Sequence, residues 1–521
     1  MTLTMPARPA NRKVGSAWVL AATILGSSMA FIDGTVVNVA LPAIQAEFRA
    51  TLVDVQWIVE AYALLLAALL LAGGSLGDRF GRRRVFAAGT LLFAGASVWC
   101  GLAPDVRHLI AARGVQGAGG ALLVPGSLAI LASSFSNRER GRAIGTWSGF
   151  TAITAAAGPV LGGWLIDHLS WRWAFFINVP LAAAVLVITF RRVPESRDEA
   201  AKGRVDWPGA TLATLGLGGL VYALIESSDL GWRHPAVLAA LAGGVLSIAL
   251  FVLVEQRAEE PMLPMTLFSS RDFTGANLLT LFLYTALSGV FFFLPLNLIQ
   301  VQGYSAAKAG AALLPFILLM FLLSRWSGGL FDRIGAKIPL VAGPAVASAG
   351  FALFALPGVG GSYWTTFFPA MVVLGLGMAT SVAPLTTTVM SSVEGRHAGA
   401  ASGINNAVSR TAGLISVAVL SLVMLSEFRH GLHERLSASR VPPELAAAIE
   451  SQSTRLAAIE LPAGVPAAER DPARGAITSA FLGGFRRVMW IGAGLALLAA
   501  LTALALIKGR VRGGRRPLPA R

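Results

Sequence analysis

Charged residues and cysteine are scarce in this chain of 521 residues. Only 13% of the residues are Asp, Glu, Lys or Arg, whereas 55% are hydrophobic, and the mean hydropathy is +0.67. This composition excludes a soluble globular protein and predicts an integral membrane protein. Cys100 is the only cysteine and lies in an apolar stretch, so the sequence predicts neither a disulfide nor a cysteine-based metal or redox centre.

The sequence also lacks convincing enzyme motifs. Residues 73–77 match the nucleophile-elbow pattern, but they end an apolar span instead of joining a strand to a helix. The glycines of 117–120 lack the lysine and the spacing of a phosphate-binding loop. His430 and His433 have no third metal ligand near them. We therefore expect no enzyme activity, no metal and no cofactor, and any energy must come from an ion gradient.

Apolar stretches of membrane-spanning length recur along the whole chain. Each needs about 20 residues to cross the hydrocarbon as a helix, and spanning strands are excluded because they would alternate in polarity over about 10 residues. The fold class is therefore all-α. We count fourteen spans, centred in 14–39, 55–77, 85–102, 108–134, 143–166, 173–190, 207–225, 235–254, 273–298, 309–330, 338–356, 363–390, 398–426 and 488–507.

The seventh and eighth spans look like an insertion, because charged, proline-containing segments flank the pair on both sides. We expect a six-helix bundle over 1–195, an inserted helix pair with its linkers over 196–270, and a second six-helix bundle over 271–521. The polar stretch 427–487 is expected to be an external loop within the second bundle. Its apolar patches predict short amphipathic helices. It lids the external opening, contacts an adaptor protein or merely connects two spans.

Lys and Arg are concentrated in every second segment between the predicted spans. With the N-terminus inside, the short cytoplasmic segments and tails hold 26 of them and the short external turns hold 5. This is the positive-inside asymmetry, so both termini are predicted to be cytoplasmic. The net charge of +15 is explained by this membrane face. We therefore expect the lipid bilayer as a partner and no nucleic acid.

Asp33 lies near the end of a long uncharged run and points to function. An ionised carboxylate there costs at least about 3 kcal/mol, so a partner or a proton must compensate its charge. Arg113 in the fourth span is predicted at the same depth. A nearby arginine favours the carboxylate and burial favours the acid, so the pair can form a proton site in which protonation of Asp33 frees Arg113. A static ion pair between two helices is the alternative.

An Asp-Arg-x-Gly turn occurs at 78–81, after the second span, and again at 332–335, after the tenth. Two parallel halves are how many transporters build a cavity that opens alternately to either side. Residues 74–86 resemble motif A of the major facilitator superfamily, 109–117 resemble motif B, and 158–163 resemble the end of the antiporter motif C. With 33–42 and 171–180, they resemble the fourteen-helix drug:proton antiporters. Thr154 stands where motif C usually has a glycine, which predicts a relaxed helix contact.

The resemblance implies a secondary exporter of drugs, antibiotics or other amphipathic toxic compounds, exchanged for protons by alternating access in the bacterial cell membrane. A nutrient or metabolite symporter and a non-transporting membrane sensor are the alternatives. The antiporter motif disfavours the first, and the intact Asp33 and Arg113 disfavour the second. The fifth span is a candidate hinge, because its glycines allow close helix approach and its proline interrupts the backbone hydrogen bonds; the residues are Gly158, Pro159, Gly162 and Gly163. The resemblance also implies a cytoplasmic gate, with the candidates Gly74, Asp78, Arg79, Gly81, Arg82, Asp332 and Arg333.

Four polar residues are candidates for substrate contact: Glu60, Asn38, Gln116 and Glu226. Glu60 lies in the second span at a depth similar to that of Asp33. It binds a cationic substrate or a second proton, or it stays hydrated at the mouth of the cavity. Glu226 is closer to the membrane interface.

Overall fold

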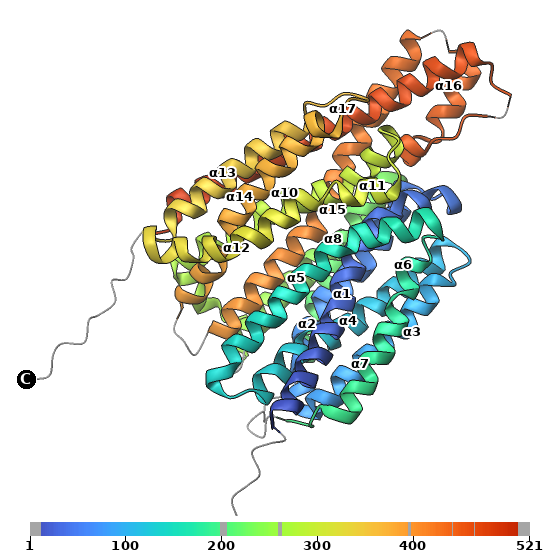
Figure 1. Cartoon of the computed structure of the whole chain (residues 1–521). Coiled ribbons are helices and arrows are strands. Elements are labelled where there is room, and N and C mark those ends of the chain that lie inside the picture. The colour runs from blue at the N-terminus through green and yellow to red at the C-terminus, as the bar shows by residue number, and fades with distance from the viewer. Residues whose placement is uncertain are drawn as a thin grey trace, which may run out of the picture. The chain divides into compact units, whose positions relative to one another are not determined.

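The computed structural model describes residues 12–197, 206–258, 263–393, 398–439, 441–462 and 464–508, and within these ranges every regular element is a helix (Figure 1). The predicted all-α fold is confirmed. In the described residues, thirteen helices are long and apolar enough to cross a membrane, and they coincide with thirteen of the predicted spans. The remaining predicted span, 143–166, lies within a continuous helix of 32 residues.

The contacts divide the chain into two compact units. In the described residues, unit 1 comprises positions up to 258 together with 294–311 and 417–481, and unit 2 comprises 263–293, 312–416 and 482–508. The inserted helix pair therefore belongs to unit 1 by its contacts. The predicted division into two six-helix bundles and an inserted pair stays a prediction.

Unit 1 holds the first nine helices, which are α1 (Arg12–Phe48), α2 (Leu52–Phe80), α3 (Arg82–Gly101), α4 (Val106–Ser134), α5 (Asn137–His168), α6 (Trp173–Phe176), α7 (Asn178–Arg192), α8 (Trp207–Leu230) and α9 (Pro235–Arg257). It also holds the π-helical turn η2 (Asn297–Val301), α11 (Ala306–Ala311), α16 (Pro443–Glu450) and η4 (Ser453–Ala458). Unit 2 holds η1 (Met265–Ser269), most of α10 (Arg271–Leu296), α12 (Leu314–Ile334), α13 (Lys337–Phe354) and α14 (Tyr363–Ser391), while α15 (Ala398–Ala438) and α17 (Ala467–Leu506) contribute to both units.

Polar side chains fix where several helices begin. Asp105 accepts a hydrogen bond from His108 N at 2.9 Å and caps α4. Asp206 caps α8 in the same way through Gly209 N at 2.8 Å. At α2, Thr51 and Asp54 form a reciprocal capping box. These carboxylates and hydroxyls satisfy the first N–H groups of each helix, which have no partner within the helix.

Glycines bring α4 close to its neighbours. A Cβ at Gly119 would lie 2.6 Å from Phe93 N on α3, and a Cβ at Gly117 would collide with the Tyr62 backbone on α2. Helices in membranes associate through such small residues because close packing replaces the hydrophobic effect. This tight packing fixes the positions of the polar side chains that α2, α3 and α4 carry.

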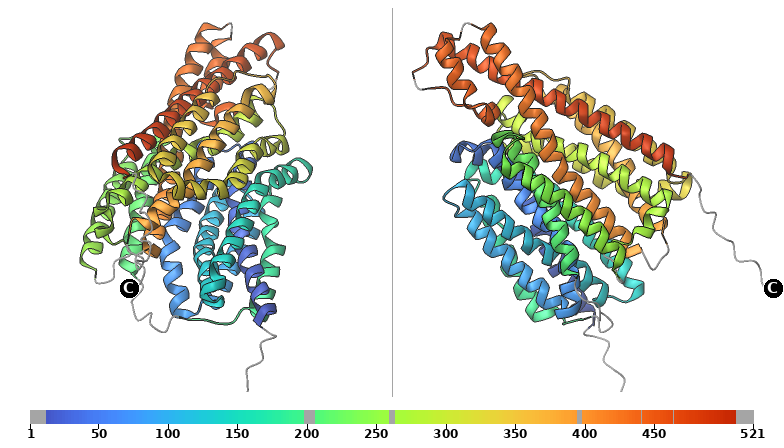
Figure 2. Two further views of the ribbon diagram at one scale, coloured as in Figure 1. Left: turned by 60° about the vertical axis from the view of Figure 1, so that its left-hand side comes forward. Right: turned by 180° about the vertical axis from the view of Figure 1, so that it is seen from behind.

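The predicted external loop is a helical hairpin. α15 continues to Ala438 and α17 starts at Ala467, so both helices extend well beyond their predicted spans, with α16 and η4 between them (Figures 1 and 2). Phe428, Leu432, Ile449 and Phe481 are each at most 1% exposed. The hairpin therefore has a hydrophobic core of its own, which the prediction of a loop with short amphipathic helices did not include.

We expect Gly119→Val to destabilise unit 1 by about 1–3 kcal/mol, because the added carbons overlap the α3 backbone. The measurement is the melting temperature of the detergent-purified protein. Gly95→Val is the matched control, since in the described structure nothing lies within 4 Å of a Cβ at Gly95 on α3. Equal melting temperatures for the two variants would contradict the assigned packing.

Candidate functional site

Asp33 lies on α1 with no exposed surface, and its carboxylate accepts hydrogen bonds from three side chains. Arg113 Nη1 donates to Oδ2 at 2.5 Å. Gln116 Nε2 and Asn178 Nδ2 donate to Oδ1 at 2.7 and 3.3 Å. The structure thus places Asp33 and Arg113 in a direct buried ion pair, at the common depth that the sequence predicts.

Arg113 on α4 is itself only 1% exposed and is held from several directions. Its Nε donates to the carbonyl of Ile58 on α2 at 3.0 Å, and its Nη1 also donates to Gln116 Oε1 at 2.6 Å. Its guanidinium carbon lies 4.2 Å from the Tyr62 ring centroid and 5.8 Å from that of Phe175. A carbonyl oxygen, a carboxylate and the face of an aromatic ring each stabilise a cation that is shielded from water.

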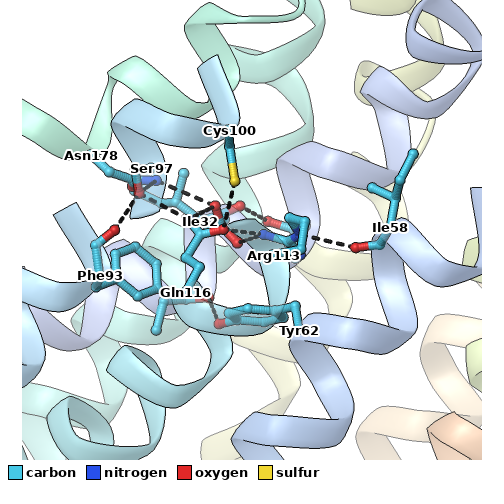
Figure 3. Close-up of polar contacts among 12 residues, drawn as sticks. Ile32, Ile58, Tyr62, Phe93, Ser97, Cys100, Arg113, Gln116 and Asn178 are labelled. Carbon is cyan, nitrogen blue, oxygen red and sulfur yellow. Dashed lines mark hydrogen bonds and ion pairs between the residues drawn. The ribbon is translucent and has the colours of Figure 1, made fainter. Parts of the chain in front are cut away.

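Two further polar groups complete the network (Figure 3). Ser97 on α3 accepts hydrogen bonds from Gln116 Nε2 at 2.9 Å and from Asn178 Nδ2 at 3.3 Å, and it donates to the Phe93 carbonyl. The thiol of Cys100 donates to Gln116 Oε1 at 3.7 Å. The network around Asp33 therefore draws on α1, α2, α3, α4 and α7, which are all helices of unit 1.

The arrangement stabilises one negative charge where water cannot reach it. Three donors favour the ionised carboxylate, whereas exclusion from water opposes ionisation. Removing one partner from such a buried pair costs about 3–5 kcal/mol, because the other charge remains buried without compensation. A proton delivered to Asp33 would cancel the charge to which Arg113, Gln116 and Asn178 are directed. Binding and release of a proton by Asp33 stay a prediction.

The other candidates for substrate contact lie in different surroundings. Gln116 belongs to the Asp33 network and has no exposed surface. Glu60 on α2 is 1% exposed, and among the described residues no hydrogen-bond partner reaches its Oε2. Asn38 projects from another face of α1 than Asp33, because five residues turn a helix by about 140°.

Glu226 joins the inserted pair to α2. Its Oε1 accepts a hydrogen bond from Trp57 Nε1 at 2.8 Å, and the Trp57 ring lies 6.1 Å from that of Tyr222, on the same helix as Glu226. This contact holds α8 against α2. Direct contact of Glu226 with a substrate stays a prediction.

Ser97, Asn178 and the Ile58 carbonyl are parts of the network that sequence reasoning missed. Asn178 offered a signal, since it is a polar residue within the predicted span 173–190 and within a segment that carried the family resemblance. Ser97 offered little, because a serine in a membrane helix commonly bonds the carbonyl four residues before it, as this one also does. A backbone carbonyl has no sequence signal at all.

The antiporter-motif glycines lie along α5 where it meets other helices. A Cβ at Gly158 would collide with Thr35 Oγ1, and one at Gly162 would lie 2.9 Å from Val36 Cγ1, so both glycines bring α5 against α1. Thr154, one turn before Gly158, makes an interhelical hydrogen bond: its hydroxyl donates to Ser28 Oγ on α1 at 3.0 Å. A relaxed helix contact at this position stays a prediction.

The predicted gate turn joins α2 to α3. Asp78 accepts from Arg82 Nε at 2.8 Å, and Arg79 lies over the Phe80 ring. Gly81 has φ +110°, and Gly335 in the second such turn has φ +76°, so the repeated glycine serves a left-handed backbone in both places. A Cβ at Gly74 would lie 3.7 Å from Pro125 Cβ, in ordinary van der Waals contact. Arg333 is exposed on α12, and the side chain of Asp332 lies outside the part that the structure describes.

Glu195, which follows α7, binds the gate turn from the adjoining linker and was not a sequence candidate. Its Oε1 accepts from Arg83 N at 3.1 Å, and its Oε2 lies 3.7 Å from both Arg83 Nε and Arg84 Nε. The Ser196 carbonyl accepts from Arg82 N at 3.0 Å. A Cβ at Gly81 would lie 2.7 Å from Glu195 Oε1, so the glycine also makes room for this carboxylate.

Known proteins resemble the chain over most of its length. The model of the Major Facilitator Superfamily matches residues 23–417. The tetracenomycin C resistance and export protein of Streptomyces glaucescens is 33% identical over 501 residues, which cover 95% of this chain and 93% of that protein. The multidrug resistance protein Stp of Mycobacterium tuberculosis is 36% identical over 411 residues, or 78% of this chain and 75% of that protein.

A solved structure shares the fold. It is a bacterial homolog to the human lysosomal transporter Spinster, in an inward-facing and occupied conformation, with a TM-score of 0.65 and 15% identity. The likeness covers 96% of this chain and 97% of that one. At this identity, the comparison supports the architecture alone.

We expect Glu195→Ala to accelerate amide hydrogen exchange in peptides that cover residues 81–86. The change removes the acceptor for Arg83 N and the carboxylate between two arginines, so the start of α3 opens more often. Mass spectrometry of the purified protein measures it. Glu139→Ala is the control, because Glu139 accepts instead from Ser136 Oγ at the start of α5. Unchanged exchange over 81–86 would show that Glu195 does not hold the turn.

Proposed function

The chain belongs to the Major Facilitator Superfamily, and we propose that it is a secondary active exporter of drugs, antibiotics or other amphipathic toxic compounds, driven by proton antiport. Relatives named for antibiotic resistance and export support the substrate class. The observation that carries proton coupling is the fully buried Asp33 carboxylate, paired with Arg113. The proposal includes the bacterial cell membrane as its location, with both termini in the cytoplasm.

The proton site works through a change in what Arg113 contacts. Ionised Asp33 binds the guanidinium directly. Once Asp33 is protonated, Arg113 retains the Ile58 carbonyl, Gln116 Oε1 and the Tyr62 ring, but it loses its counter-charge. The five helices that meet at Asp33 are then held less tightly together. This loosening favours the conformational change of alternating access, and substrate release accompanies the exchange.

Glu60 is the proposed contact for cationic substrates. It is only 1% exposed, which argues against the hydrated alternative. Its Oε2 has no hydrogen-bond partner among the described residues. A charge pair is worth more in such surroundings than in water. A lipophilic cation or a second proton would each compensate the carboxylate.

The gate turn supports alternating access in a different way. Asp78 and Arg82 are paired, and Glu195 and Ser196 fix the following residues from the linker after α7. We propose that this assembly, with Asp332 and Arg333 in the equivalent turn, controls closure on the cytoplasmic side.

Symport of a nutrient and a non-transporting sensor remain the competing functions. A sensor has no need of a buried proton site, and the Gly158–Gly163 contacts on α5 carry the antiporter motif that disfavours symport.

We expect Asp33→Asn to abolish proton-driven efflux in proteoliposomes with an imposed pH gradient. The amide keeps the shape and one acceptor for Gln116 but does not titrate. Arg113 retains its contacts to Ile58 and Tyr62, so we expect the variant to fold, which a melting curve checks. Cys100→Ser is the control in the same cluster, since it changes one weak contact and no charge. Full proton-driven transport by Asp33→Asn would refute the coupling role.

We expect Glu60→Gln to weaken the binding of a monovalent lipophilic cation by about tenfold, or about 1.4 kcal/mol, and to leave a neutral substrate nearly unaffected. Binding and resistance are measured for both compounds in wild type and variant. A parallel loss for both would identify Glu60 as a second proton carrier. Unchanged values for both would remove it from the substrate site.

A further inference from the structure

Asp167, in the last turn of α5, holds a segment that is distant in the sequence. Its Oδ1 accepts a hydrogen bond from Ala306 N and its Oδ2 accepts one from Ala307 N, each at 2.9 Å. Both carboxylate oxygens are therefore directed at the first two N–H groups of α11. Neither N–H has a partner within its own helix, because helices leave their first amides unsatisfied. A carboxylate is the side chain that accepts both at once.

Two glycines bring the backbones of α5 and α11 into contact. A Cβ at Gly163 would collide with the Ala306 carbonyl, and a Cβ at Gly310 would collide with the carbonyl of Pro159. The two helices therefore touch where each has a glycine, next to the antiporter-motif proline. A contact between glycine backbones contains no directional bond. The two hydrogen bonds of Asp167 fix how far α11 lies along α5.

The same segment is attached to α1 as well. Gln300 Nε2, in η2, donates to Gln45 Oε1 at 2.8 Å, and Gln45 Nε2 donates to the Arg455 carbonyl of η4 at 3.2 Å. Residues 294–311 thus belong to unit 1, although the residues before and after them belong to unit 2. The chain therefore enters this segment from unit 2 and returns to unit 2 after it.

We propose that Asp167 is a positioning residue for transport: it fastens α11 to α5, and release of its two hydrogen bonds is a required step when the predicted external end opens. This inference rests on the proposed alternating-access function. α1 ends and α2 begins at this end, which the positive-inside asymmetry predicts to be external. In the wild type, Asp167 keeps this end closed until substrate and proton drive it open.

Hydrogen exchange tests the fastening without any transport. In Asp167→Ala, we expect the amides of peptides covering 304–311 to exchange about tenfold faster, which is the effect of losing roughly one charge-assisted hydrogen bond. Asp167→Asn keeps one acceptor and should give an intermediate rate. Asp105→Ala is the matched control, because Asp105 caps α4 through His108 N and, among the described residues, makes no hydrogen bond or ion pair with α11. It should affect exchange at 106–109 only.

Unchanged exchange over 304–311, or an equal rise throughout unit 1, would overturn the proposal, since the second result marks a general loss of stability. Transport separates positioning from binding: turnover of Asp167→Ala should fall severalfold with substrate affinity retained, and a matching fall of both would also overturn it. If exchange rises locally but the wild type shows no proton-driven efflux, the fastening stands and the exporter proposal fails. The two failures are therefore distinguishable.

Discussion

One buried charge organises the candidate site of unit 1. The carboxylate of Asp33 has no exposed surface, and the side chains that satisfy it come from α4 and α7, with Ser97 of α3 behind them. Arg113 extends the network to α2 through the Ile58 carbonyl. Because an uncompensated charge in this setting is costly, the five helices must keep their relative positions as long as Asp33 is ionised. In the proposed mechanism, the charge state of Asp33 is therefore coupled to the arrangement of these helices.

The glycines and the buried polar groups serve this arrangement together. Gly117 and Gly119 let α4 approach α2 and α3 closely enough for Arg113 and Gln116 to reach their partners. Along α5, the Thr154–Ser28 hydrogen bond is followed by the contacts of Gly158 and Gly162 with α1. Helices that pack through glycines touch closely, but the contact itself contains few directional bonds. The buried hydrogen bonds and the ion pair therefore determine which arrangement these helices adopt.

The sequence predicted most of the fold and the centre of the site, and the reasons are physical. A charge inside an apolar run is conspicuous, so Asp33 and Arg113 were found, and opposite helix directions gave their common depth. Partners that are ordinary in such spans, such as Ser97, or that are backbone atoms, such as the Ile58 carbonyl, carry no pattern. Glu195 and Asp167 were missed because their roles depend on which distant segment folds against them. The buried apolar side chains of the hairpin between α15 and α17 were not predicted, because they are few and are spread along a polar stretch of sequence.

The complete burial of Asp33 has an electrical consequence. A substrate cannot replace Arg113 on a carboxylate that is enclosed by its own helices, so proton and drug occupy different places in the proposed cycle. The net charge carried across the membrane is then set by the drug. Exchange of one proton for a monovalent cation moves no net charge, whereas exchange for a neutral compound moves one, worth about 2.3 kcal/mol per 100 mV. The membrane voltage would therefore drive the export of neutral compounds and leave that of monovalent cations unaffected.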